Sequence, residues 1–185
     1  MAKRLLGILL LSTGSVVLTG GSLYLLLTKS SVPANPPVEA TTDFPELSDC
    51  TNKYTSTSYG FEFCYPTIWK LGEFGDKKEI VGVDPKSAPK EGGSLGLIQI
   101  MIQEARSSDL LFSLRTMLDK EQEERETLSG VDGTRITGEV RGKLHTSVVV
   151  TKGKYTYEIS IQDDVTNYQK YLPVFENLLG SWQWK

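Results

Sequence analysis

Residues 143–162, KLHTSVVVTKGKYTYEISIQ, contain two β-prone runs on either side of Gly153. Leu144–Thr151 is rich in β-branched residues, and Lys154–Gln162 alternates between apolar and polar residues. The apolar positions of the second run are Tyr155, Tyr157, Ile159 and Ile161, and the polar positions are Thr156, Glu158, Ser160 and Gln162. Successive side chains of a strand point to opposite faces. The stretch therefore predicts two strands joined by a tight turn, with one face in a core.

Similar runs on both sides of this pair predict further strands. They are separated by turn residues such as Gly60, Pro66 and Gly142. The predicted strands are Lys53–Thr57, Phe61–Tyr65, Trp69–Phe74, Glu79–Val83, Leu95–Glu104, Gly133–Val140 and, at the end of the chain, Trp182–Trp184.

Two helices are predicted among these strands. The first runs from about Asp109 to Glu126 after a Ser108 cap, and its Glu121 and Arg125 are spaced to pair. Its apolar stripe consists of Leu110, Leu114, Met117 and Leu118. We interpret its charged residues as a solvated face.

The second helix follows Asp163-Asp164, which we interpret as a helix cap rather than a Ca²⁺ site because no series of oxygen ligands surrounds it. It ends at about Gly180. Pro173 should lie near its first turn, where a missing N–H has little effect, or it should kink the helix. The order strands, helix, strands, helix predicts an α+β domain, an antiparallel β-sheet packed with helices.

The N-terminus predicts a membrane anchor. Leu5–Leu27 is uncharged and is preceded by Lys3 and Arg4. A helix of this length spans roughly 35 Å, enough for the hydrocarbon core of a bilayer. Positive residues stay on the cytoplasmic side, so residues 1–4 are expected inside the cell and the remainder outside. The alternative is a cleaved signal peptide and a secreted protein, although the apolar run is long for a signal.

A linker and one domain are predicted after the anchor. Residues 28–52 hold four of the eight prolines together with Ser and Thr, and residues 53–185 have the length of one domain. The chain has 20 basic and 23 acidic side chains, and three of the basic ones precede residue 30. The expected external part thus carries a net charge of −6, which argues against nucleic acid as a partner.

Cys50 and Cys64 are the only cysteines. Outside the cytoplasm such a pair predicts a disulfide. Closing the loop between the two cysteines with this bond would stabilise the fold by about 3 kcal/mol. The alternatives are two free thiols or a metal pair, for which a single His in the chain is a poor complement.

Two segments carry a resemblance to a known family. Tyr59-Gly60-Phe61-Glu62-Phe63, followed by Tyr65-Pro66 and Trp69, resembles the opening of PsbP-like domains. The end of the chain, from Tyr171 through Pro173-Val174-Phe175 to Ser181-Trp182, resembles their final helix and strand. The resemblance covers roughly residues 54–184.

This resemblance implies the Mog1/PsbP-like fold, a PsbP-like α/β/α sandwich, in a bacterial, membrane-anchored relative. PsbP proteins are extrinsic subunits of photosystem II that help to retain calcium and chloride, and many bacterial relatives are anchored extracytoplasmic proteins without an assigned role. No ion-handling residue of the family can be placed on this sequence, so the resemblance implies no cofactor and no metal ligand.

Motifs of catalysis are missing from the sequence. His145, the only His, has no Ser or Cys partner by motif, and we interpret it as a half-exposed strand residue. No phosphate-binding Gly loop and no zinc spacing occurs. Trp69, Trp182 and Trp184 are interpreted as packing residues, with a carbohydrate platform as the alternative.

These observations predict a non-catalytic accessory or binding protein. It is expected to be tethered to the cell membrane by residues 5–27 and to bind a protein partner at the membrane surface. One alternative is a secreted or envelope hydrolase or metal-dependent enzyme with an unrecognised site, for which a deep cleft joining His145 to carboxylates would be evidence. The other is a structural spacer of the envelope, which predicts no pocket.

Overall fold

The computed structural model describes residues 52–185. The predicted cytoplasmic segment 1–4, the anchor 5–27, almost all of the linker and Cys50 lie outside the described residues. Within residues 52–185, no helix has the length and apolar character needed to cross a membrane. Asn52, the last residue of the predicted linker, already belongs to the first strand.

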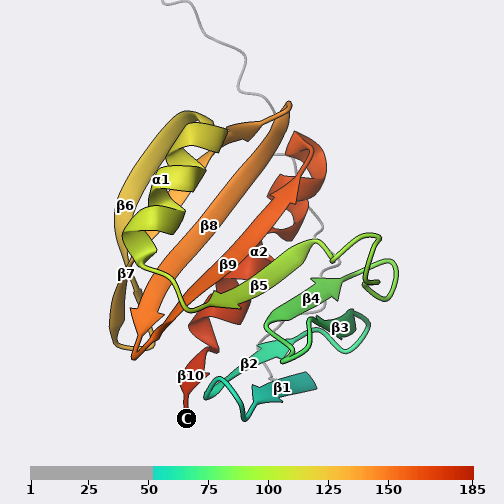
Figure 1. The fold of residues 1–185 in the computed structure, drawn as a ribbon. Helices are drawn as coiled ribbons and strands as arrows, with labels where there is room; N and C mark the ends of the chain where they lie inside the picture. Colours follow the sequence, from blue (N-terminus) through green and yellow to red (C-terminus); the bar gives the residue numbers. More distant parts are fainter. Residues whose placement is uncertain (1–51) are drawn as a thin grey trace, which may run out of the picture. The chain divides into compact units, whose positions relative to one another are not determined.

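The described residues form two antiparallel sheets and two helices (Figure 1). A seven-stranded sheet has the order β3-β4-β5-β9-β8-β7-β6, and a three-stranded sheet has the order β1-β2-β10. The elements are β1 Asn52–Ser56, β2 Phe61–Tyr65, β3 Lys70–Phe74, β4 Ile80–Asp84, β5 Ile98–Gln103, α1 Ser107–Met117, β6 Asp119–Leu128, β7 Val131–Val140, β8 Lys143–Lys152, β9 Tyr155–Asp163, α2 Val165–Gly180 and β10 Gln183–Trp184. The predicted α+β class is confirmed.

The two helices pack on opposite faces of the large sheet (Figure 1). In β9, Tyr157, Ile159 and Ile161 join the core on the α2 side, as the alternation predicts. The other side is packed by α1, whose Leu114 lies against Ile136 of β7 and Val149 of β8.

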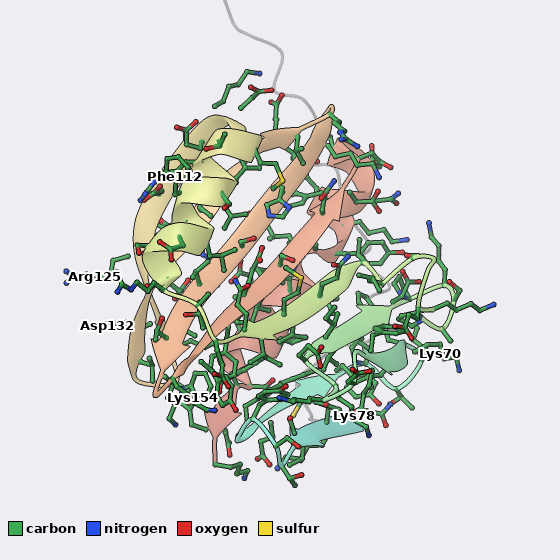
Figure 2. The ribbon with its side chains drawn as sticks, in the orientation of Figure 1. Lys70, Lys78, Phe112, Arg125, Asp132 and Lys154 are labelled. Carbon is green, nitrogen blue, oxygen red and sulfur yellow. The ribbon has the colours of Figure 1, made fainter. Side chains whose placement is uncertain are left out.

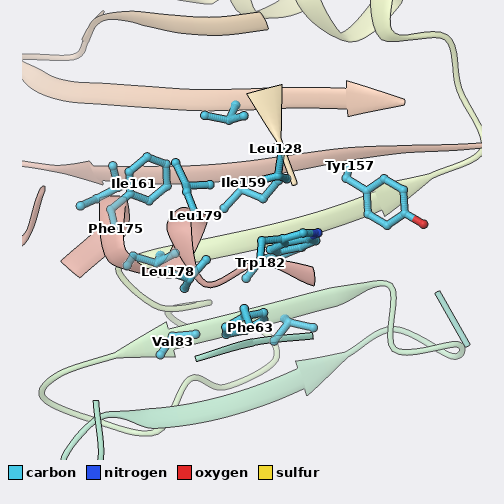
Figure 3. Packing of buried hydrophobic residues seen from close by; sticks show 14 of the residues in the cluster. Phe63, Val83, Leu128, Tyr157, Ile159, Ile161, Phe175, Leu178, Leu179 and Trp182 are labelled. Atoms are coloured by element: carbon cyan, nitrogen blue, oxygen red, sulfur yellow. The ribbon is translucent and has the colours of Figure 1, made fainter. Parts of the chain in front are cut away.

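The main core lies between α2, the large sheet and β2. Its buried residues include Phe63, Val83, Leu128, Tyr157, Ile159, Ile161, Phe175, Leu178, Leu179 and Trp182 (Figure 3). The ring of Trp182 stacks on Phe61 with centroids 4.5 Å apart. Trp69 is also buried, and Trp184 packs partly buried against the same cluster. These aromatic residues therefore serve as packing residues, and they form no exposed carbohydrate platform.

The predicted helix Asp109–Glu126 is wrong in its second half. Helix α1 ends at Met117, Leu118 is extended, and Asp119–Leu128 is the edge strand β6, which pairs with β7 along its length. Pairing with a neighbouring strand outweighs the helix propensity of the Glu, Lys and Gln residues here. Consequently, Glu121 and Arg125 do not face each other on a helix. Ser108 is not the cap either, because α1 follows Arg106 and Ser108 lies in its first turn.

Arg135 of β7 connects this edge to α2. Its side chain, mostly buried, donates to Glu126 of β6 at 2.9 Å and to Glu176 of α2 at 2.6 Å. Both carboxylates raise the pKa of Arg135 above its ordinary value, with Glu176 as the larger cause. The acidic run of β6 thus contributes a specific contact to the fold.

The cap of α2 is confirmed, and of the two alternatives for Pro173 the position near the first turn is wrong. Asp164 accepts a hydrogen bond from the backbone N–H of Asn167 at 3.0 Å, as an N-cap residue does. Pro173 lies inside the helix Val165–Gly180 instead of near its first turn. The helix continues past it because the buried residues on both sides, such as Tyr168 and Phe175, hold this face against the sheet.

Two phenylalanines on the two helices allow a matched test of this packing. Phe175 of α2 is 0% exposed, and Phe112 of α1, which is labelled in Figure 2, is 69% exposed. We expect Phe175→Ala to lower the free energy of unfolding by about 3–5 kcal/mol, because it leaves a cavity in the core. Phe112→Ala should change it by no more than about 0.5 kcal/mol. Urea denaturation followed by tryptophan fluorescence measures both, and equal effects would contradict the described core.

Candidate functional site

Helix α1 covers only part of its face of the large sheet. It packs on β7 and β8, whereas β9 and β5 lie beside it uncovered by either helix on this side (Figure 1). On this side, β9 and β5 present mainly polar side chains. They include Gln99, Met101, Glu158, Ser160 and Gln162.

A cavity of about 290 Å³ lies in the angle between α1 and these strands. Its apolar wall comes from α1, with contributions from β5 and the residue before it. The lining residues are Leu97, Gln99, Met101, Leu110, Ser113, Leu114, Met117, His145, Glu158, Ser160 and Gln162. Cavities of this kind, mostly apolar with a few converging polar groups, are typical of small-molecule sites.

Three polar side chains form a hydrogen-bonded chain beneath the cavity, and the two ends of the chain, His145 and Glu158, line it. His145 Nε2 and Ser147 Oγ lie 2.7 Å apart, and Ser147 Oγ donates to Glu158 Oε1 at 2.7 Å. His145 is 5% exposed, Ser147 0% and Glu158 5%. Such deep burial of a carboxyl and an imidazole is unusual.

The strand pairing brings these three residues together. His145 and Ser147 are two apart in β8 and therefore share a face. Ser147 pairs with Ser160 of β9, which makes Glu158 its diagonal neighbour. Cross-strand diagonals remain within reach of long side chains, and the glutamate spans the gap.

The direction of the chain determines the tautomer of His145. The Ser147 hydroxyl gives its single proton to Glu158 Oε1. His145 then donates from Nε2–H to Ser147 Oγ, and its Nδ1 keeps a lone pair. That buried Nδ1 has no hydrogen-bond partner among residues 52–185.

Burial shifts the pKa values of both titratable groups. Desolvation lowers the pKa of His145 below its ordinary value, and the side chain of Gln162 opposes this effect. Desolvation raises the pKa of Glu158, and the hydrogen bond from Ser147 opposes it. His145 is therefore held neutral at the cavity floor. Perturbed groups of this kind cluster at functional sites.

The interpretation of His145 as a half-exposed residue without a partner is wrong. It is buried because α1 packs over the neighbouring residues of β8, such as Val149. The sequence analysis also missed Ser147 as a partner and Glu158 as a site residue. The sequence does contain a signal for this arrangement. Pairing the two strands around the Gly153 turn places the polar face of β9 beside His145 and Ser147.

The chain of hydrogen bonds does not have the order of a catalytic triad. In a triad the imidazole lies between the nucleophile and the carboxylate. Here the serine lies between the imidazole and the carboxylate, and its hydroxyl is fully buried. A substrate carbonyl cannot approach Ser147 Oγ in this arrangement.

A second hollow of about 430 Å³ adjoins the cavity and shares Leu97, Gln99 and Gln162 with it. Its charged lining residues are Asp84, Lys143 and Asp163. No group of three or more His, Cys, Asp or Glu residues that could hold a metal ion occurs within residues 52–185.

Cys64 lies on β2 and is buried, and its backbone N–H donates to Ser181 Oγ at 2.9 Å. Its predicted partner Cys50 lies outside the described residues. The Cys50–Cys64 disulfide therefore stays a prediction.

No protein-family description matches the sequence, and no curated protein matches it either. Among solved structures, cyanobacterial PsbP (CyanoP) from Synechocystis is similar, with 12% identity, a TM-score of 0.48, and coverage of 72% of this chain and 92% of that chain. PsbP is the family whose motifs the sequence resembles.

Two other solved structures are similar to a comparable degree. A protein from Bacteroides thetaiotaomicron has 12% identity and a TM-score of 0.47, covering 72% of this chain and 48% of that chain. LpqN, involved in cell envelope biogenesis of Mycobacterium tuberculosis, has 12% identity and a TM-score of 0.46, covering 71% of this chain and 90% of that chain. These likenesses concern the fold alone and assign no site, ligand or partner to this chain.

The burial of His145 gives a direct pH prediction. Because the pKa of His145 is lowered in the folded protein, the unfolded chain binds more protons as the pH falls below the ordinary value of 6.5. The contribution of His145 to stability is therefore complete above that pH and is lost as the pH falls towards the lowered pKa.

As His145 is the only His, its imidazole NMR signals need no assignment. We expect its titration midpoint in the folded chain to lie below that of the urea-unfolded chain. A folded midpoint equal to or above the unfolded one would show that the imidazole is hydrated and that the described burial is wrong.

Proposed function

We propose that this protein is a non-catalytic accessory protein that binds a ligand in the cavity between α1 and the uncovered strands. The single observation that carries this proposal is the buried polar chain of His145, Ser147 and Glu158 on the floor of that cavity. A binding site uses a few placed polar groups to orient what enters.

We further propose that residues 5–27 hold the chain in the cell membrane, with residues 28–51 as a spacer and the described domain on the outside. The support is the uncharged run after Lys3 and Arg4 and the proline content of the spacer. A protein partner at the membrane surface belongs to the same proposal, because an accessory domain on a tether acts on what lies near the bilayer.

One specific observation favours the enzyme alternative. The cavity does join His145 to a carboxylate, that of Glu158, as an envelope hydrolase would require. The hydroxyl between them is the obstacle, since Ser147 is fully buried and already occupied on both sides. The spacer alternative expects no pocket, and the cavity counts against it.

Photo-crosslinking in intact membranes tests the binding role. Met117 at the cavity is 46% exposed, and Val165 at the start of α2, outside the cavity lining, is 50% exposed. We expect Met117→p-benzoylphenylalanine to give an adduct on irradiation and Val165→p-benzoylphenylalanine to give none. Adducts at neither position, or equally at both, would contradict binding at this cavity. Mass spectrometry of the adduct distinguishes a small ligand from a protein partner.

Intact-mass analysis tests the tether and the bridge together. The full chain, purified from membranes without reductant, is expected to keep residues 1–27 and to show the mass of a closed Cys50–Cys64 bridge. Reductant should then raise the mass by two hydrogens. A mass without the apolar segment would identify a cleaved signal, and a mass unaffected by reductant would show two thiols.

A further inference from the structure

We propose that the cavity binds a small organic cation, a protonated amine attached to an apolar group. This inference rests on the proposed function and names the class of ligand for the same cavity. It follows from the kinds of polar groups that the cavity offers, from the charges around it and from its size.

The polar groups at the cavity are mainly acceptors. His145 Nδ1 keeps a lone pair without a partner among residues 52–185. Glu158 uses Oε1 to accept from Ser147, and Oε2 remains available. Gln99 donates one of its two amide N–H groups to the carbonyl of Gly96 at 3.1 Å, and its oxygen is an acceptor. A ligand that fits this set must donate hydrogen bonds.

Part of the donors at the cavity is engaged within the protein, and Ser160 and Gln162 of the lining keep donors of their own. The hydroxyl of Ser113 donates to the carbonyl of Asp109 at 3.0 Å, and the hydroxyl of Ser147 donates to Glu158. An anionic ligand would therefore face Glu158 with few donors to stabilise it. This arrangement disfavours carboxylates, phosphates and sulfates.

Acidic side chains outnumber basic ones around the cavity. No Lys or Arg lines it, and Glu158 is its only acidic residue. The adjoining hollow adds the carboxylates of Asp84 and Asp163 against the single ammonium of Lys143. An ammonium group has three donors and no acceptor, so it complements both the acceptors and the negative charge.

The remaining walls require an apolar part of the ligand. Leu110, Leu114 and Met117 of α1 face Leu97 and Met101 across the cavity. Its volume of about 290 Å³ is just below the range of ligand pockets, roughly 300–1,000 Å³. A single aromatic ring or a short aliphatic chain on the amine suits this space better than a peptide or a lipid.

The binding experiment uses the full chain in lipid nanodiscs, prepared with a tag free of histidine. The probes are 2-phenylethylamine and its neutral counterpart 2-phenylethanol, and the readout is the imidazole NMR signal of His145. We expect the amine to shift this signal saturably and to bind at least about tenfold more tightly than the alcohol, because hydrogen bonds to a charged group are the stronger ones. Equal binding of the two probes would overturn the ligand class.

A pair of glutamate variants locates the charge. Glu158→Gln should reduce the affinity for 2-phenylethylamine about tenfold and leave that for 2-phenylethanol nearly unchanged. Glu121→Gln on the exposed strand β6 should change neither. An unchanged amine affinity in Glu158→Gln would overturn the proposal, and the wild-type comparison of the two probes stands independently of how this variant folds.

The two proposals fail in distinguishable ways. An adduct at position 117 together with no amine-induced shift of His145 would leave the binding function in place and remove the amine as its ligand. No adduct at position 117 would remove the binding function at this cavity. An amine-induced shift that Glu158→Gln abolishes supports the ligand class directly.

Discussion

The pairing register of β8 and β9 is the constraint on which the rest of the structure depends. It places Val148 and Ile159 on the α2 side and Ser147 and Glu158 on the α1 side. Because side chains alternate along a strand, a slip by one residue would exchange the two sets. The apolar core would then be exposed, and the polar chain would face α2. One register thus determines both the core of the domain and the composition of its cavity.

Most of the fold could be predicted because most strands carry this alternation. Strands β2, β5, β7, β8 and β9 lie close to their predicted ranges. Strand β6 could not, because an edge strand with two exposed faces has no apolar alternation to reveal it, and its charged residues are also good helix formers. Nothing local in the acidic run indicates that Gln122 and Glu124 pair with β7. That information lies in the partner strand.

The sequence contains the residues of the candidate site but does not indicate how they are arranged in space. His145 is the only His in the sequence. Glu158 occupies one of the polar positions of its strand, and such positions ordinarily face water. Whether the polar face of a sheet is exposed depends on where a helix docks, and α1 docks through Leu114 onto Ile136 and Val149, with Leu118 just after the helix in the same cluster. No periodicity within β8 or β9 encodes that contact, so the burial of the polar face required the structure.

The composition of the cavity floor argues for selection beyond stability. The opposite side of the same two strands shows how a core is built here, from residues such as Val148 and Ile159. An imidazole and a carboxyl at the equivalent depth on the α1 side lose hydration, and each costs free energy unless its hydrogen bonds are restored. Ser147 restores one bond for each of them, whereas Nδ1 of His145 remains without a partner in the described domain. Local choices that oppose the fold are expected where function requires them. The incomplete satisfaction of this chain is therefore the strongest structural reason to place a ligand beside it.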